Sequence, residues 1–434
     1  MSSSNSQSLN QPGTPDPDFG INGQTTLYSI LNHIPGLTLR FRLKGLTTNN
    51  NGQLLFSANL FKKEHFVYGL GRLKPDGSLD GAFTPNGLAT GDFGQSLPAG
   101  ASRLTVQPDG KILMAGWTSR SSFDDWADLV VARFDDKGRP DTSFAEKGRC
   151  ILQTMPDEGL TEDSVKVHVQ KDGCILVSAN YSKRRNPALT VGVLFRLLPN
   201  GVLDPGLNGN GRLDFNLLGP SAATAINACI SQGNDYKIVI AGHAQFSPGR
   251  QTAFFARLNP DGTTDSAFGS PQTPGFHRVD SIAGDTTLYD LVERTDDKSL
   301  IGAGQVGLNG NGTTKGLIQA ITPNGAAHQL FNNGKPLVSE FDDNRDIGWQ
   351  CIMNTSAGDL TTASGGTWVY IAQFKADGTL NMDFNNKGYI DLDAPVISTP
   401  LVLAKRGDHR VIVGANVAGT DPDGGIGALF SFFG

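Results

Sequence analysis

The sequence has few cysteines, little net charge and no long apolar run. Its four cysteines, Cys150, Cys174, Cys229 and Cys351, lie far apart and form no CxxC pair, which excludes a disulfide framework and a cysteine zinc site. The formal net charge of −6 gives no bulk attraction to nucleic acid or to a membrane surface. Because no apolar run reaches about 18 residues, the sequence predicts no membrane insertion.

The start of the chain also lacks the basic and apolar segments of a secretion signal. Residues 1–11 are mostly polar and uncharged, and we expect them to form a disordered tail before a single domain at 12–434. The cytoplasm is the default location that this start predicts, and signal-independent export stays open. With 38% hydrophobic residues, the chain is able to build a core.

Signatures of nucleophilic, zinc and phosphate chemistry are missing as well. The chain contains no Gly-x-Ser-x-Gly, His-Glu-x-x-His or Gly-x-x-x-x-Gly-Lys-(Ser/Thr) motif. Residues 208–214 and 421–424 place oxygen-bearing side chains as a calcium loop does, but turn chemistry explains both segments. The sequence therefore predicts no catalytic motif, no metal ligands and no cofactor.

Glycine, in contrast, is abundant, and it heads a motif, Gly-x-x-Asp-x-x-Phe, that recurs seven times. The glycines are Gly13, Gly77, Gly138, Gly201, Gly262, Gly325 and Gly378. The Asp column contains Asp16, Asp80, Asp141, Asp204, Asp265, His328 and Asn381. The apolar column contains Phe19, Phe83, Phe144, Leu207, Phe268, Phe331 and Phe384. Such regular spacing indicates an internal structural repeat.

A second motif lies about halfway between these copies and also recurs seven times. Its clearest copy is Pro108-Asp-Gly-Lys-Ile-Leu-Met-Ala-Gly116. Asp-Gly between alternating apolar runs predicts a hairpin, because glycine accepts the positive φ of a tight turn. Each unit of about 60 residues is therefore expected to hold four strands. Its Asp should accept hydrogen bonds from turn amides, and its Phe should pack between neighbouring sheets.

Seven four-stranded units predict an all-β fold, a seven-bladed β-propeller of four-stranded antiparallel blades. The first copy of the motif, at Gly13, starts inside a unit, and residues 427–434 form a third strand. We therefore expect the N-terminal strand to complete the last blade and to close the ring without a free sheet edge.

The repeat pattern, DGK-(I/L)-x-x-AG followed by R-(F/L)-x-PDG and D-x-x-F-G, resembles the delta-60 repeat family of β-propellers over about residues 12–434. The match is strong around 72–150 and 171–270 and weaker around 297–391, where His328 and Asn381 replace Asp. The resemblance implies a largely bacterial, mostly uncharacterised propeller, often thought of as a binding or adhesion module. It brings no catalytic residues with it.

The loops between the second and third strands vary most and should surround the mouth of the central channel. Two of them carry side chains that the repeat does not require: Trp117, Arg120 and Trp126 in one, and Lys183, Arg184 and Arg185 in the next. Indole rings and guanidinium forks suit sugar rings, carboxylates or a protein surface. We expect these six residues to form a ligand-binding rim; the alternative is solvated loops packed on their own blades.

Three functions stay open at this point. The first is a non-enzymatic binding propeller that recognises a glycan or protein partner, but no nucleic acid, on its loop face. The alternative is a hydrolase or lyase with an active site at the mouth of the central channel, for which Asp163, His168 and Asp346 are the candidates. The second alternative is a scaffold or toxin-associated module. Neither the ligand nor the oligomeric state can be read from the residues.

Overall fold

The computed structural model describes residues 11–434 except 63–64, 122–125, 184, 220, 248, 280–281, 283, 308–312, 342–344, 356–357, 366–368, 393, 395, 408 and 420–424. The predicted tail at 1–11 therefore lies, but for Gln11, outside the described residues. Almost all regular structure in the described part is β-strand, as predicted. The helical segments there are α1 (Leu27–Leu31) and the short 3-10 turns at Pro85–Gly87 and Asn332–Gly334.

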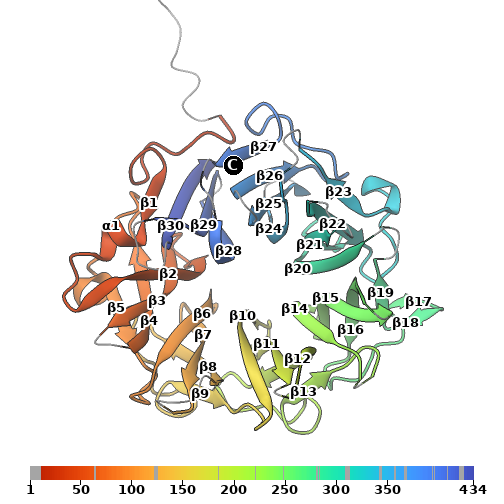
Figure 1. Ribbon diagram of the computed structural model, residues 1–434, viewed down its shortest axis with the longest axis horizontal. Coiled ribbons are helices and arrows are strands. Elements are labelled where there is room, and N and C mark those ends of the chain that lie inside the picture. Colours follow the sequence, from red (N-terminus) through yellow and green to blue (C-terminus); the bar gives the residue numbers. More distant parts are fainter. Residues whose placement is uncertain are drawn as a thin grey trace, which may run out of the picture.

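The strands form antiparallel meanders of four, arranged like propeller blades around one axis (Figure 1). The first strands, nearest the axis, are β2 (Leu37–Thr48), β6 (Ala99–Val106), β10 (Glu158–Val169), β14 (Thr224–Gln232), β20 (Asp285–Glu293), β24 (Trp349–Asn354) and β28 (Val396–Arg406). The second strands are β3 (Leu54–Lys62), β7 (Ile112–Ser119), β11 (Ile175–Lys183), β15 (Lys237–Ser247), β21 (Leu300–Gly307), β25 (Leu360–Gly365) and β29 (Arg410–Ala418).

The third and fourth strands lie progressively farther from the axis. The third strands are β4 (His65–Leu73), β8 (Ala127–Phe134), β12 (Asn186–Leu197), β16 (Arg250–Leu258), β22 (Lys315–Ile321), β26 (Val369–Phe374) and β30 (Gly425–Phe433). The fourth strands are β5 (Leu88–Gly91), β9 (Arg149–Leu152), β13 (Arg212–Phe215), β19 (Phe276–Arg278), β23 (Leu337–Ser339), β27 (Tyr389–Leu392) and β1 (Gln24–Thr26). A two-stranded ribbon, β17 (Gly269–Ser270) and β18 (Thr273–Pro274), precedes β19.

Among the described residues, five of these meanders are separate four-stranded sheets. The β10–β13 and β14–β19 meanders share one sheet, because a parallel bridge joins Val191 to Thr224. The blade number predicted from the repeats stays a prediction.

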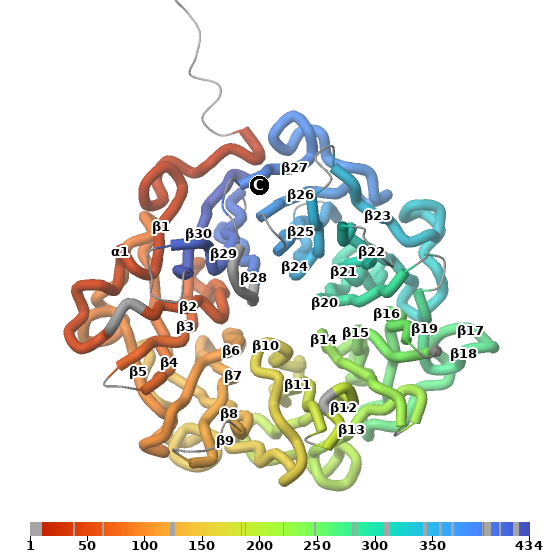
Figure 2. The backbone as a smooth tube through the Cα atoms, viewed as in Figure 1, coloured from red at the N-terminus to blue at the C-terminus, as the bar shows by residue number. Residues whose placement is uncertain are grey.

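The N-terminal strand closes the ring. Strand β1 pairs antiparallel with β30, placing Gln24 opposite Phe430 and Thr26 opposite Ala428. First strands contact one another in sequence from β2 to β28, and β28 contacts β2. Figure 2 shows the red N-terminal segment beside the blue C-terminal strands. The predicted closure of the last blade by the N-terminal strand is confirmed.

In six of the seven repeats, the apolar residue lies beneath the turn glycine of the next blade. Phe268 is fully buried, and a Cβ added at Gly325 would lie only 3.0 Å from its ring. Gly325 also has a φ of +85°, so glycine is required there on two counts. The backbone N–H of Gly269 donates to the carbonyl of Asn324 in the same turn at 2.9 Å. All members of the apolar column are buried: Phe19, Phe83, Phe144, Leu207, Phe268, Phe331 and Phe384.

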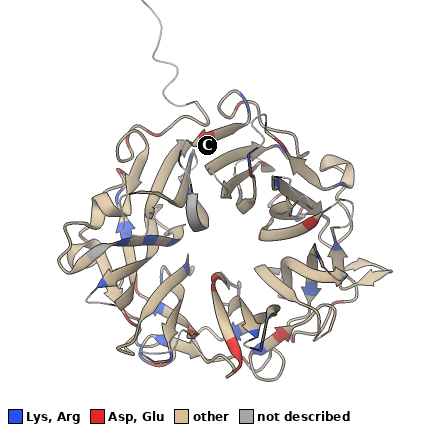
Figure 3. Ribbon diagram, viewed as in Figure 1, with Lys and Arg blue, Asp and Glu red and all other residues tan. Residues whose placement is uncertain are grey.

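The Asp column adds a charged link to this contact. Asp265 accepts the backbone N–H of Ala267 at 3.2 Å and the Nε–H of Arg257 at 2.8 Å. Arg257 also donates through Nη1 to the carbonyl of Pro323 in the next blade, at 2.8 Å. Equivalent ion pairs join Arg72 to Asp80, Arg133 to Asp141 and Arg196 to Asp204. Figure 3 shows both charge signs spread around the ring.

The weak repeats depart from this pattern in a consistent way. Where Asn381 replaces Asp, the partner on the third strand is Gln373, and the Asn381 Nδ2 donates to the Gln373 Oε1 at 3.2 Å. Where His328 replaces Asp, the third strand carries Ala320 in place of Arg, and the His328 backbone N–H donates to the Ala320 carbonyl as Asp265 does to Arg257. Loss of the carboxylate thus accompanies loss of the guanidinium, so no buried charge is left unpaired.

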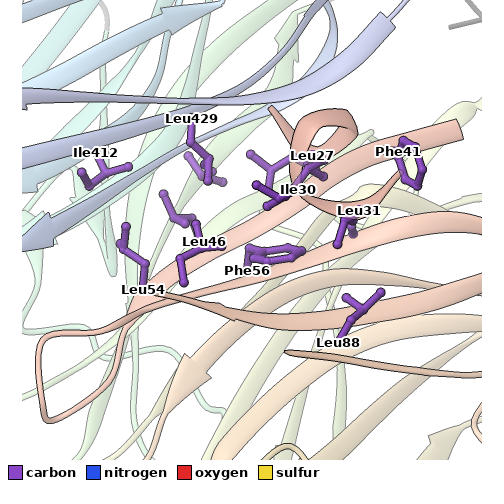
Figure 4. Close-up of a cluster of buried hydrophobic side chains, with 14 of the residues drawn as sticks. Leu27, Ile30, Leu31, Phe41, Leu46, Leu54, Phe56, Leu88, Ile412 and Leu429 are labelled. Carbon is purple, nitrogen blue, oxygen red and sulfur yellow. The ribbon is translucent and has the colours of Figure 1, made fainter. Parts of the chain in front are cut away.

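Separate apolar clusters fill the spaces between blades. Figure 4 shows the cluster between the last blade and the first, where Leu27 and Leu31 of α1 pack near Phe41, Phe56 and Leu429. Thr26 caps α1 by accepting the backbone N–H of Ser29 at 3.0 Å. The short helix therefore covers the junction at which the ring closes.

We expect Phe268→Ala to lower the free energy of unfolding by about 3–5 kcal/mol, the usual cost of truncating a core aromatic residue. Leu330→Ala is the control, because Leu330 is 80% exposed and its truncation should change stability by less than about 0.5 kcal/mol. Chemical denaturation measures both values. Equal losses in the two variants would contradict the inter-blade role of Phe268.

Candidate active site at the channel mouth

A β-bulge or a larger irregularity of pairing interrupts every first strand of the described sheets; both are called bulges below. The pairing of first and second strands shifts between Leu43 and Gly45, Ala101 and Leu104, Thr161 and Lys166, Ile226 and Ala228, Leu288 and Asp290, Trp349 and Cys351, and Ser398 and Val402. A bulge breaks the alternation of a strand and re-aims its side chains. The polar residues inside these bulges include Lys44, Arg103, Asp163, Asn227, Tyr289 and Gln350.

Residues just after the bulges line a cavity of about 160 Å³ at the axis. Within it, the Lys166 Nζ lies 3.5 Å from the Asp290 Oδ1, and the Asp290 Oδ2 accepts the backbone N–H of Ile352 at 3.0 Å. Burial lowers the pKa of Lys166 and of Arg103, an effect that the Asp290 carboxylate opposes. Burial also raises the pKa of the Cys351 thiol to about 12, so this thiol is protonated.

A second cavity, of about 310 Å³, lies toward the end of the axis at which the first strands begin. Side chains from five consecutive blades meet in its lining, and Arg103 lines both cavities. Its functional side chains are Arg103, Asp163, Asn227, His243, Tyr289 and Gln350. We call this cavity the mouth cavity.

Hydrogen bonds and an ion pair hold several of these groups in place. The Asp163 Oδ1 lies 2.7 Å from the Lys44 Nζ, so a bulge residue of the first blade anchors a bulge residue of the third. The Asn227 Nδ2 donates to the carbonyl of Leu288 at 2.7 Å, and the Asn227 Oδ1 accepts from the Asn180 Nδ2 at 3.2 Å. The mouth cavity therefore has a preorganised polar wall.

Two neutral proton carriers face the same space. Burial lowers the pKa of His243 to about 4, although Asp285 opposes the shift, so its imidazole is uncharged at neutral pH. The His243 Nδ1 is buried and has no hydrogen-bond partner among the residues that the structure describes. Burial raises the pKa of Tyr289, which keeps its phenol protonated. Both groups are therefore uncharged at neutral pH.

His243 and Trp117 occupy a repeated position on the second strand. In other blades the position holds Asn59, Asn180 or Asn416, and each amide accepts a backbone N–H from the first strand of the next blade at 2.7–2.8 Å. Trp117 instead packs against Gly100 and is 8% exposed within β7. The expectation that Trp117 stands outside the repeat, at the start of a loop, was therefore wrong.

The remaining rim candidates have mixed placements. The ring of Trp126 covers Gly159 of β10, because a Cβ there would fall 1.4 Å from the indole. Lys183 and Arg120 are bound by carboxylates: the Lys183 Nζ lies 2.7 Å from the Glu158 Oε1, and the Arg120 Nε lies 3.0 Å from the Asp128 Oδ1. Arg185 is exposed, and Arg184 lies outside the described residues. A ligand-binding role for these residues stays a prediction.

Of the three enzymatic candidates from the sequence, Asp163 lines the mouth cavity. His168 lies farther along β10, where burial lowers its pKa to about 4. The Asp346 Oδ1 accepts the backbone N–H of Thr314 at 2.6 Å, which is a structural task. Sequence reasoning missed Arg103, Asn227, His243, Tyr289 and Gln350. Except for His243, which lies on the second strand β15, their signal was a polar or aromatic residue that breaks the apolar alternation at one repeated position of the first strand.

The first calcium-like loop is a hydrogen-bonded turn, in which the Asn210 Oδ1 accepts the backbone N–H of Arg212 at 3.0 Å. The second, at 421–424, lies outside the described residues. In the described ranges no three His, Cys, Asp or Glu side chains gather in a way that could hold a metal ion. No helix of the described chain is long and apolar enough to cross a membrane.

Comparisons with known proteins place the chain among β-propellers. Residues 107–144 and 234–268 match a family described as a domain of unknown function (DUF5122), a beta-propeller. No curated protein sequence matches the chain.

Several solved propellers are similar over almost their full length. A protein of unknown function from Dyadobacter fermentans shares 12% identity and a TM-score of 0.46, covering 92% of this chain and all of its own. The polysaccharide lyase Uly1 shares 12% identity and a TM-score of 0.49, covering 94% and 95%. An alpha-L-arabinanase from Penicillium chrysogenum shares 12% identity and a TM-score of 0.44, covering 92% and 94%.

These similarities correct the first functional expectation. At such identities they establish the fold alone, but they include propellers described as a polysaccharide lyase and an arabinanase. The fold therefore gives no preference for a non-enzymatic binding module, and that interpretation was wrong.

We expect Lys183→Ala to destabilise the protein by about 1–3 kcal/mol, because it removes a partner from a buried carboxylate. Glu158 is fully buried and would keep Arg212, at 2.9 Å, as its one described cationic partner, beside the backbone N–H of Met155 at 3.4 Å. Arg185→Ala, a change in the exposed part of the same loop, should leave the melting temperature unchanged. Differential scanning calorimetry compares the two variants, and equal melting would show that Lys183 has no structural role.

Proposed function

We propose that this protein is a glycan-processing enzyme, a hydrolase or a lyase, with its active site in the mouth cavity. The observation that supports this best is the convergence of a guanidinium, a carboxylate, an imidazole and a phenol from separate blades, at Arg103, Asp163, His243 and Tyr289. Structural packing does not require such a set at one point, whereas acid–base chemistry does.

The cavity suits a hydroxyl-rich ligand. Amide groups of Asn180, Asn227 and Gln350 line it beside the charged groups, and a volume of about 310 Å³ is of the size that small-molecule sites have. Amides donate and accept at once, as sugar hydroxyls do. The substrate class also follows the activities named for the similar solved propellers. We further propose that residues 12–434 form one domain built of delta-60-type repeats.

The proposal is tested by incubating the protein with a panel of neutral and acidic polysaccharides and measuring chain length and new reducing ends. We expect at least one polymer to be cut, and Tyr289→Phe and Asp163→Asn each to lower kcat/KM by about 10²–10⁴-fold, the usual contribution of an acid–base group. Asp346→Asn is the matched control, because its amide oxygen can still accept the Thr314 N–H. A panel without any cleavage, or full activity in both variants, would contradict the proposal.

A further inference from the structure

Arg103 is a cation whose two interacting carboxylates, Asp163 and Asp290, are each already paired with a lysine. No described carboxylate lies within ion-pairing distance of Arg103 itself, whereas Lys166 is paired with Asp290 and Lys44 with Asp163. Burial lowers its pKa, which reflects the cost of keeping this charge away from water. A partly buried guanidinium of this kind is stabilised when an anion enters the cavity that it lines. The mouth cavity is therefore built for a ligand that carries a negative charge.

The described lining of the mouth cavity also holds a single carboxylate. Most glycoside hydrolases need two, one on each side of the glycosidic bond. Here Asp163 is the carboxylate, and Lys44 binds it at 2.7 Å, while Asp290 belongs to the deeper cavity, where Lys166 and the Ile352 N–H hold it. This set fits poorly with hydrolysis by a carboxylate pair.

The same set fits elimination from an acidic sugar. In a uronate residue the proton on C5 is acidic only once the neighbouring carboxylate is neutralised, as a guanidinium can do. A neutral imidazole can then take that proton, and a phenol can protonate the leaving oxygen. Arg103, His243 and Tyr289 supply these three groups on one cavity.

We propose, on the basis of the proposed function, that the substrate is a uronate-containing polysaccharide and that the reaction is β-elimination. Arg103 binds and neutralises the uronate carboxylate, His243 accepts the C5 proton, and Tyr289 donates a proton to the leaving O4. The C5–H and C4–O4 bonds break, a C4=C5 double bond forms, and no water is consumed. The Tyr289 phenolate regains a proton from His243 or solvent before the next turnover.

The test uses a set of polyuronates together with the same polymers after reduction of their carboxylates to primary alcohols. We expect the polyuronates to yield products with the ultraviolet absorbance of an unsaturated uronate, without ¹⁸O from labelled water, and the reduced polymers to stay intact. Cleavage of the reduced polymers, or ¹⁸O in the product, would overturn elimination while leaving the proposed function standing. Absence of cleavage in every polymer would overturn both.

Variants separate the roles of the residues. Arg103→Ala should lower kcat/KM on polyuronates by about 10²-fold or more and weaken oligouronate binding in calorimetry, and Arg103→Lys should recover part of both. His243→Gln should abolish turnover with little loss of binding. His168→Gln, a change on a first strand outside the mouth cavity, is the control and should match the unaltered protein. Equal oligouronate affinity in Arg103→Ala would contradict the charge-neutralising role of Arg103.

Discussion

One contact, repeated around the ring, holds each blade to the next. An apolar side chain such as Phe268 fills the space beneath the turn glycine of the following blade, and the adjacent Arg257–Asp265 pair reaches that blade through the carbonyl of Pro323. The contact combines burial of a large ring with satisfaction of a charge and a turn, and in the two weak repeats the buried rings of Phe331 and Phe384 remain although the charged pair is absent. At the junction where the ring closes, the Asp16 Oδ2 forms the equivalent ion pairs, with the Arg406 Nη2 at 2.8 Å and the Arg410 Nε at 2.7 Å.

The position of the candidate site follows from this arrangement. Outer contacts fix the blades, which places the first strands side by side around the axis. Bulges then free a few inner positions from the strand alternation, and these positions carry Arg103, Asp163, Asn227, Tyr289 and Gln350. Because the outer contacts already hold the blades together, the side chains at the bulges are not needed for packing and can differ from blade to blade. A regular scaffold thereby presents an asymmetric set of functional groups.

The fold could be predicted because its determinants are local and repeated. The turn glycines, the Asp column and the Phe column recur at a regular spacing, which reveals their roles in turns, hydrogen bonds and packing. Ring closure was predicted because the first motif copy, at Gly13, belongs to the fourth strand of a unit. The site could not be predicted in the same way. His243 comes from a second strand and Tyr289 from the first strand of the next blade, and only the bulges and the ring curvature bring them to one cavity.

The rim prediction relied on residues that seemed foreign to the repeat; their ligand-binding role stays a prediction, but two of them have structural tasks. Trp117 occupies a regular second-strand position, and Lys183 neutralises the buried Glu158. Large or charged side chains at irregular sequence positions can therefore serve the scaffold. The candidate groups other than His243 instead occupy equivalent first-strand positions in successive units, where a polar or aromatic side chain interrupts an apolar strand.

The assignment of the mouth cavity as the active site depends most on where a ligand binds. A crystal structure of the protein with a bound acidic oligosaccharide would decide this directly. The account predicts a sugar carboxylate within hydrogen-bonding distance of the Arg103 guanidinium, with His243 and Tyr289 beside the same sugar ring. A ligand seated on the loops that carry Trp126 and Arg185, with the mouth cavity empty, would contradict it.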